Sequence, residues 1–152
     1  MFHGEFDSTV DDKGRVILPA RLRDEMGAER EEGFYVTFGP DGCVELCPPD
    51  EWDRRVEAMR GPKGQAILKA RARRFKRKMS ALTEKSTPDK QGRIRLHQNV
   101  LQKAGITKDV KIVGNFDTIE VWDRERYQQE DAESDREYRN DAEDLFTGPS
   151  EP

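Results

Sequence analysis

The chain has 152 residues, which is enough for one ordinary domain or two very small ones. Charged residues make up 38% and hydrophobic residues 34%, with a mean hydropathy of −0.98, so we expect a small core and a large solvated surface. No uncharged run approaches the length of a membrane span, which excludes a transmembrane protein. Two cysteines are too few for a disulfide scaffold, so we expect a protein of the reducing cytoplasm. No basic stretch followed by an apolar segment opens the chain, so we expect no secretion by the signal-peptide route.

Charge is distributed unevenly along the chain, although the net charge is only −4. Residues 123–152 carry 11 acidic and 4 basic side chains, which leaves residues 1–122 with a net charge of +3. Within that body, residues 58–83 carry 9 Lys or Arg and no acidic residue. A basic middle followed by an acidic end favours a polyanionic partner, although charge alone does not show that such a partner binds.

An internal repeat organises the chain. Residues 11–18, Asp-Asp-Lys-Gly-Arg-Val-Ile-Leu, match residues 89–96, Asp-Lys-Gln-Gly-Arg-Ile-Arg-Leu, at an offset of 78 positions. Residues 44–46 then match residues 119–121 at an offset of 75. A duplicated unit of about 45 residues is shorter than most independently stable domains, so neither copy is expected to have a core of its own.

The first copy begins with an extended segment and a tight turn, followed by a strand, a short helix and a β-hairpin. Gly14 suits a turn position with positive φ, Pro19 suits the first turn of a helix, and Gly-Pro-Asp-Gly at 39–42 suits the hairpin turn. The expected segments are 2–10 (extended), 15–18 (strand), 19–26 (helix), and 34–38 and 43–47 (hairpin strands).

The second copy repeats this order, and helices are expected after each hairpin. Capping residues place helix starts at 48–50 and at Asp123. The segments expected in the second copy are 81–87 (extended), 93–96 (strand), 98–104 (helix), and 110–113 and 118–122 (hairpin strands).

A basic helix is predicted between the copies, and an acidic helix at the end. In the basic helix, apolar residues recur at spacings of four and three on one narrow stripe: Leu68, Ala72, Phe75, Met79 and Leu82. The acidic end keeps few large apolar residues, so we expect a helix that frays into disorder by residues 147–152.

Two incomplete copies in one chain favour an intramolecular pseudo-dimer. We predict a mainly β fold with short helices, of the α+β class, in which strands of one copy complete the sheet of the other in one pseudo-twofold β-barrel. The expected boundaries are 5–52 and 83–126 for the two copies, 53–82 for the helical connector with its basic run, and 127–152 for the acidic helix and tail.

The repeated Asp-x-x-Gly-Arg turn supplies the main candidate site. Asp11 and Asp89 each begin a turn, and Arg15 and Arg93 follow four residues later. One interpretation is an Asp–Arg pair that only pins the turn. The other is an arginine held so that its planar fork meets a phosphate or a guanine edge. Spacing alone does not decide between them.

The basic helix leaves two interpretations open as well. Its Lys and Arg residues either form a solvated or inter-subunit face, or contact a nucleic-acid backbone, with Arg73 and Arg77 as candidates. No aromatic residue beyond Phe75 is interleaved with them, so stacking on single strands is not supported.

Other chemistry is poorly represented. Cys43 and Cys47 are expected to be small strand residues rather than a metal pair or a redox switch, because further ligands are missing. His3 and His97 belong to no triad arrangement, and there is no phosphate-binding glycine loop. Asp11-Asp12 is a candidate Mg²⁺ pair, but no third acidic ligand stands out. We therefore predict no enzyme, no metal and no cofactor.

Taken together, these segments resemble the MraZ family of bacterial transcriptional regulators. Met-Phe-His-Gly-Glu at 1–5 and the run at 11–23 are similar to the start of that family. Residues 89–96, 111–114 and 119–123 are similar to its second half. The similarity covers residues 1–127, in order and with the expected spacing.

The resemblance implies two SpoVT-AbrB, or swapped-hairpin, domains in one barrel and a ring-shaped homo-oligomer. It also implies binding of double-stranded DNA, as a repressor at direct repeats in the promoter of its own division and cell wall gene cluster, in the cytoplasm and on the nucleoid. The DNA-binding positions carry over to Asp11, Lys13, Arg15, Asp89 and Arg93. Because Gln91 replaces the first copy's lysine, we expect the first copy to lead.

Two other functions remain open from the sequence. The chain is alternatively an antitoxin-like or scaffold protein of the AbrB fold that acts through protein contacts, with the acidic residues 130–144 on a basic partner. A metal-dependent nuclease is a further alternative, and it predicts DNA cleavage on addition of Mg²⁺.

Overall fold

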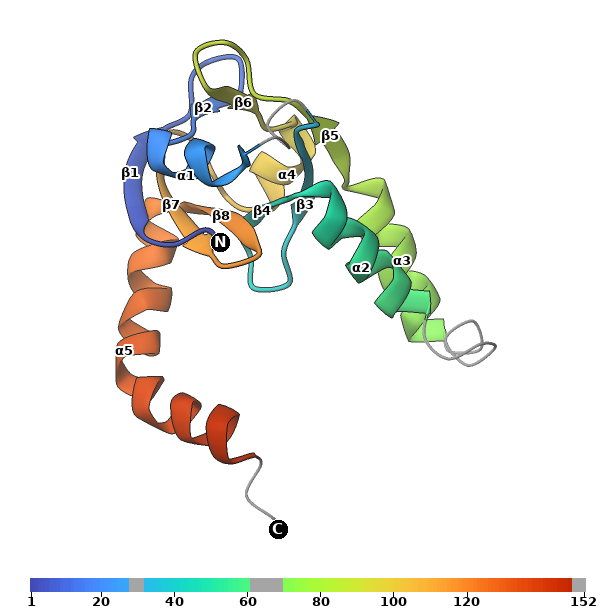
Figure 1. The fold of residues 1–152 in the computed structure, drawn as a ribbon, viewed down its shortest axis with the longest axis vertical. Coiled ribbons are helices and arrows are strands. Elements are labelled where there is room, and N and C mark those ends of the chain that lie inside the picture. The colour runs from blue at the N-terminus through green and yellow to red at the C-terminus, as the bar shows by residue number, and fades with distance from the viewer. Residues whose placement is uncertain (28–31, 61–69, 149–152) are drawn as a thin grey trace.

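A computed structural model describes residues 1–27, 32–60 and 70–148, and it has the predicted α+β character (Figure 1). The first half of the chain forms β1 (Glu5–Thr9), β2 (Arg15–Ile17), α1 (Ala20–Glu25), β3 (Phe34–Phe38), β4 (Val44–Cys47) and α2 (Pro49–Arg60). The second half forms α3 (Ala70–Ala81), β5 (Glu84–Ser86), β6 (Arg93–Arg95), α4 (Gln98–Lys103), β7 (Asp109–Asn115), β8 (Thr118–Asp123) and α5 (Arg124–Thr147).

The element order confirms the repeat. Each copy has a strand, the Asp-x-x-Gly-Arg turn, a short strand, a short helix, a hairpin and a longer helix. Helix α1 begins one residue after the predicted start because Pro19 is its N-cap and keeps an extended ψ of 140°. The hairpin strand at 34–38 has the predicted bounds, and the other strands differ by a few residues at their ends.

Strands are exchanged between the copies in the large sheet. Its order is β1-β7-β8-β4-β3-β5. β1 of the first copy pairs antiparallel with β7 of the second, and β5 of the second copy pairs antiparallel with β3 of the first. β4 and β8, the last strands of the two hairpins, pair in the middle. As predicted, strands of each copy therefore complete the sheet of the other.

The short strands β2 and β6 form a separate two-stranded ribbon. Val16 lies opposite Ile94 in its register, and neither side chain is exposed. The ends of the ribbon are joined by reciprocal backbone hydrogen bonds, from Leu18 N to Gly92 O at 2.9 Å and from Leu96 N to Gly14 O at 2.8 Å. Each copy thus donates a backbone hydrogen bond to the turn of the other.

The predicted closed barrel is not confirmed among the described strands. They form an open six-stranded sheet with β1 and β5 at its edges, and the separate ribbon. A single antiparallel bridge, between Val10 and Val16, connects the end of β1 with β2. The mainly β, α+β class is correct at this level.

One hydrophobic core serves both copies. It includes side chains of the ribbon, of α1 and α4, and of the large sheet. Its largest fully buried members include Phe34, Leu18, Leu22, Leu96 and Ile112. Burial of residues from both halves in one cluster explains why a copy of this size does not need its own core.

The longer helices lie outside this core. In Figure 1, α2 and α3 run side by side away from the sheet on one side, and α5 leaves it on the other. None of the three helices has a buried residue. α3 is the predicted basic helix, although Leu68 and the expected disorder at 149–152 lie outside the described residues. No helix in the described segments is long and apolar enough to cross a membrane.

Gly14→Ala should destabilise the protein, because φ at this glycine is +77° and an added Cβ would lie 2.9 Å from Leu96 O. We expect a loss of roughly 1–3 kcal/mol in the free energy of unfolding, measured by urea denaturation. Gly27→Ala is the matched control, since Gly27 also has positive φ but no atom within 4 Å of the added Cβ. Equal losses in the two variants would contradict the role assigned to the Leu96 carbonyl.

Candidate nucleic-acid interface

The first Asp-x-x-Gly-Arg turn is closed by one carboxylate. Asp11 Oδ1 accepts hydrogen bonds from the backbone N–H groups of Lys13 (3.0 Å) and Arg15 (2.8 Å). Asp11 Oδ2 accepts a third from Arg15 Nε at 2.8 Å, so the same side chain fixes the backbone and the guanidinium. The separation of four residues between Asp11 and Arg15 is the length of this turn, in which Gly14 N also donates to Asp11 O at 3.0 Å.

The second turn has the same geometry. Asp89 Oδ1 accepts from the backbone N–H groups of Gln91 and Arg93, both at 2.9 Å, and Asp89 Oδ2 accepts from Arg93 Nε at 2.7 Å. Gly92, with a φ of +79°, occupies the place of Gly14. The duplicated motif is therefore a duplicated structure. Asp11 and Asp89 position the backbone of the turn and the arginine side chain, whether that arginine only pins the turn or also contacts nucleic acid.

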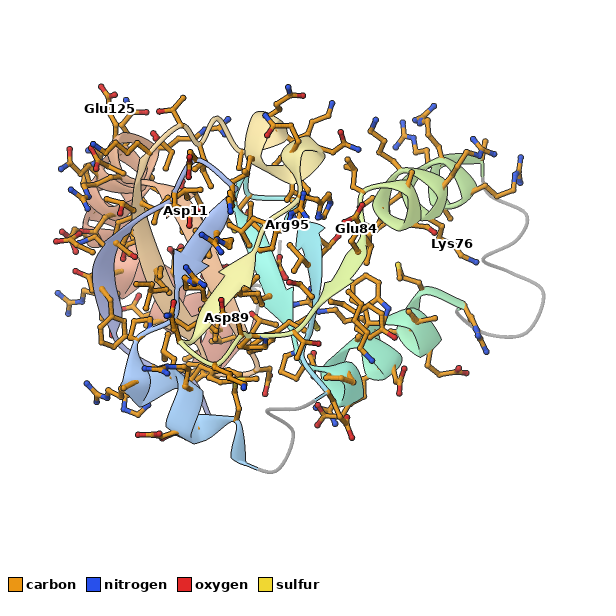
Figure 2. All side chains as sticks on the ribbon, turned by 90° about the horizontal axis from the view of Figure 1, so that it is seen from above. Asp11, Lys76, Glu84, Asp89, Arg95 and Glu125 are labelled. Atoms are coloured by element: carbon orange, nitrogen blue, oxygen red, sulfur yellow. The ribbon has the colours of Figure 1, made fainter. Side chains whose placement is uncertain are left out.

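The ribbon brings the two turns onto one surface. Register pairs Arg15 with Arg95 and Ile17 with Arg93, so these four side chains alternate with the buried Val16–Ile94 pair and share the outward side. We call Arg15, Arg93 and Arg95 the arginine face; Ile17, opposite Arg93, lies on the same side and is 54% exposed. Figure 2 shows Asp11, Asp89 and Arg95 around the ribbon, seen from above.

Arg95 was not among the residues singled out in the sequence. The available signal is strand alternation, because Arg95 lies two positions after Arg93 and so has the same parity. Its position opposite Arg15 depends on the register between the two copies, which no local pattern fixes. Arg95 is exposed, and it adds a third guanidinium to the face.

The clamps keep both carboxylates ionised. Hydrogen bonding by the backbone N–H of Arg15 is the largest cause that lowers the pKa of Asp11, followed by the Arg15 side chain and the backbone of Lys13. The backbone N–H of Arg93 has the same leading role in lowering the pKa of Asp89. Each clamp uses Nε of its arginine, and within the described residues the two terminal nitrogens have no hydrogen-bond partner, so they can donate to a further acceptor.

The two turns differ in what surrounds them. Lys13 is exposed on the first turn, and its counterpart is Gln91, so the first turn has one more cation at its tip. At the second turn the guanidinium of Arg23 packs directly over Gly92, whereas an apolar side chain, Leu101, lies near Gly14. Arg23 Nε is a buried donor without a hydrogen-bond partner within the described parts of the chain. The faces of the two copies are thus related but not equal.

The basic helix is not part of this surface. Arg73 and Arg77 are exposed on α3. In both figures α3 lies well apart from the ribbon. The structure therefore brings together Asp11, Lys13, Arg15, Asp89 and Arg93, but it does not bring α3 to them.

A cluster of candidate metal ligands also occurs in the large sheet. Cys43, Glu45 and Glu120 place ligand atoms within 4.8 Å of one another. The two carboxylates already have protein partners, because Arg55 donates to Glu45, and Asn115 Nδ2 and Trp122 Nε1 donate to Glu120. Burial raises the pKa of the Cys43 thiol, which opposes the thiolate that a metal requires. The cluster therefore fits a hydrogen-bonded strand pair better than a metal centre.

Asp11, one of the two aspartates of the nuclease alternative, already has hydrogen-bond partners. Both oxygens of Asp11 accept hydrogen bonds from the turn that they close. His3 contacts Arg21, and His97 contacts the carbonyl of Leu82, so each histidine has a different hydrogen-bond partner.

Comparison with known proteins decides the family. The profile described as "MraZ protein, putative antitoxin-like" matches residues 1–76 and 79–147. The chain belongs to the MraZ family. Among its relatives, the protein named "Transcriptional regulator MraZ" of Lachnoclostridium phytofermentans is 39% identical over 128 residues, covering 84% of this chain and 85% of the relative. The protein of the same name from Heliobacterium modesticaldum is 37% identical over 146 residues, covering 96% and 97%.

The clamp of this MraZ-family protein should depend on pH. The folded-state pKa of Asp11 lies below the ordinary value of 3.8, so the clamp's stabilisation is complete above 3.8 and is lost as the pH falls through the lowered pKa. Asp11→Asn should therefore lower the melting temperature near neutral pH, with a difference from the wild type that shrinks in acid. Asp12→Asn, on the same turn, is the control. A difference that stays constant into acid would contradict the clamp.

The two cysteines of this MraZ-family protein should be unreactive in the folded state. Both are buried, and burial raises the pKa of Cys47 to about 12 and that of Cys43 further. Only the thiolate is nucleophilic, so at neutral pH a thiol-specific chromogenic disulfide should label neither cysteine until denaturant is added. Rapid labelling of the native protein would show that this strand opens.

Proposed function

We propose that the protein is a DNA-binding transcriptional regulator that represses its own division and cell wall gene cluster at direct repeats in the promoter. The observation that carries the proposal is the arginine face, where guanidinium groups from both copies are held on one exposed ribbon. The names of the relatives at 37–39% identity support regulation of transcription.

The geometry suits the DNA major groove. That groove is wide enough to admit a two-stranded β-ribbon, and arginine is the side chain that most often contacts the O6 and N7 atoms of guanine. Asp11 and Asp89 hold Nε of their arginines, so less side-chain freedom is lost when the terminal nitrogens bind. Arg15, Arg93 and Arg95 then meet base edges and phosphates, and Lys13 adds a phosphate contact on the first turn.

In this proposal the first copy contributes more to DNA binding than the second. Its turn tip carries Lys13, whereas the second has Gln91, and a lysine at this place adds one releasable counterion on binding. Arg93 still takes part because it lies on the same side of the ribbon as Arg15, and Asp89 takes part by accepting a hydrogen bond from Arg93 Nε. Unequal halves also suit direct repeats, since each chain then has a defined orientation on its site.

Assembly supplies the remaining affinity. We include in the proposal that the ribbon and the large sheet of each chain together form one swapped-hairpin AbrB-like barrel. Several such chains then assemble into a ring-shaped homo-oligomer. Several ribbons then bind successive repeats, so weak contacts add through avidity. Arg73 and Arg77 on α3 are the candidates for contacts with the DNA backbone. The protein would act in the cytoplasm on the nucleoid, without a catalytic step or a cofactor.

Arg15→Ala should abolish specific binding while the circular dichroism spectrum stays unchanged. The lost contact corresponds to about 1–3 kcal/mol for each ribbon, and the losses add over an assembly. The measurement is a titration of the DNA upstream of the gene against a shuffled sequence, at two salt concentrations. Arg54→Ala is the matched control, because Arg54 is an exposed arginine of α2 that pairs with Asp50 and Glu51.

Three outcomes contradict the proposal. Equal binding to the specific and the shuffled DNA would leave only a polyanion binder. Normal binding by Arg15→Ala would remove the arginine face from the site. Absence of any DNA binding by the wild-type protein would favour the protein-contact function that the antitoxin-like description of the family suggests.

A further inference from the structure

The end of α5 carries an exposed apolar stripe. Tyr138, Ala142, Leu145 and Phe146 follow one another at spacings of four, three and one, which places them on one side of the helix. Tyr138, Leu145 and Phe146 are 76%, 78% and 83% exposed. We call these four residues the α5 stripe. Three large apolar side chains on one side of a projecting helix are typical of a surface that binds a protein.

The helix presents this stripe at a fixed place because its first turn is anchored. Arg126 donates to the carbonyls of Gly42 (3.2 Å) and Ala104 (3.0 Å), and Tyr127 donates to Glu5 at 2.6 Å. After this turn the recorded ion pairs are internal to the helix, such as that between Arg139 and Glu143. The distal half of α5 therefore projects from the core as a preformed rod (Figure 1).

The flanks of the stripe are acidic. Asp135 lies one turn before Tyr138 on the same side, and Asp141 lies one turn after it. Over residues 130–144 the helix has eight acidic and two basic side chains. A partner for the stripe must therefore combine an apolar groove with positive charge.

The α2–α3 hairpin offers such a groove. A cavity of about 380 Å³ lies between the two helices and β3, lined among others by Trp52, Met59, Lys76, Met79 and Ser80. Trp52 stacks on Tyr35 with ring centroids 5.1 Å apart. We call this cavity the α2–α3 groove. Its apolar walls remain partly exposed because neither helix has a buried residue.

Positive charge borders the α2–α3 groove. α3 carries six basic residues, all exposed, and no acidic one: Arg71, Arg73, Arg74, Lys76, Arg77 and Lys78. Phe75, on the same helix, is 52% exposed. The groove thus has the apolar and the electrostatic character that the α5 stripe requires.

We propose that the α5 stripe of one protomer docks in the α2–α3 groove of a second copy. In Figure 1, α5 and the hairpin leave the core on opposite sides, so the end of α5 lies apart from α2 and α3 of its own chain. A contact between two different surfaces of identical chains is head-to-tail, and it generates a closed ring when the rotation between copies allows it. This inference rests on the self-association proposed above, but it is independent of DNA binding.

Docking has a consequence for α3. Acidic residues such as Asp135 and Asp141 would lie against the basic helix, so this docking replaces the DNA-backbone contacts considered above for Arg73 and Arg77 with a contact between copies. The arginine face on the ribbon lies apart from α3 and stays open in such an assembly (Figure 2). Assembly and DNA recognition then use different parts of the molecule.

Disulfide trapping between two full-length variants tests the docking. One protein carries Ala142→Cys on the α5 stripe, and the other carries Ser80→Cys at the rim of the α2–α3 groove. The native cysteines are buried, so the engineered thiols react first on mild oxidation of the mixture. Asn140→Cys is the matched control, since a residue two positions from Ala142 lies on the other side of the helix. Each variant is also oxidised alone, to identify bonds between like chains.

A crosslinked dimer of the Ala142→Cys and Ser80→Cys chains on a non-reducing gel is the expected result. The band should be lost with the Asn140→Cys control, and lost again when Leu145→Glu is added to the Ala142→Cys chain. Light scattering on the wild-type protein separates the two proposals. An oligomer without the crosslink would overturn the docking and leave self-association standing, whereas a monomeric wild-type protein would overturn both.

Discussion

Val16 and Ile94 meet side chain to side chain, fully buried, at the centre of a ribbon to which each half of the chain contributes one strand. Everything on the candidate interface depends on this contact. It fixes the register that places Arg15 opposite Arg95, and it joins the turns through the reciprocal bonds between Leu18 and Gly92 and between Leu96 and Gly14. A repeat too small to fold alone thereby forms a fold with one surface to which both copies contribute.

The same duplication explains how the surface is made stiff without a large core. Each turn is closed by one aspartate that accepts three hydrogen bonds, two from backbone and one from arginine. The interpretation of Asp11–Arg15 as a structural pair and the interpretation as a DNA-contacting site are then compatible. The carboxylate positions Nε, and the rest of the guanidinium stays available to an acceptor outside the protein.

Local structure and the exchange of strands between the copies could be predicted from the sequence, but the register that places individual side chains opposite one another could not. Gly14 and Gly92 marked the turns because positive φ is a local requirement, and Asp123 marked the start of α5 because its side chain accepts a hydrogen bond from Arg126 N. Arg95 was missed because its role arises from pairing between strands 78 positions apart in the repeat. Arg23 was missed for a similar reason, since only the folded chain brings it over Gly92.

Amide hydrogen exchange with and without the upstream DNA tests the central claim most directly, because it locates the bound surface without a mutation. The account predicts slower exchange in residues 11–17 and 89–96 together, since both strands of one ribbon enter the groove. Exchange along α3 should change less than in these two segments. Protection confined to α3, or to one of the two turns with the other unaffected, would contradict the claim that the paired ribbon is the DNA-binding surface.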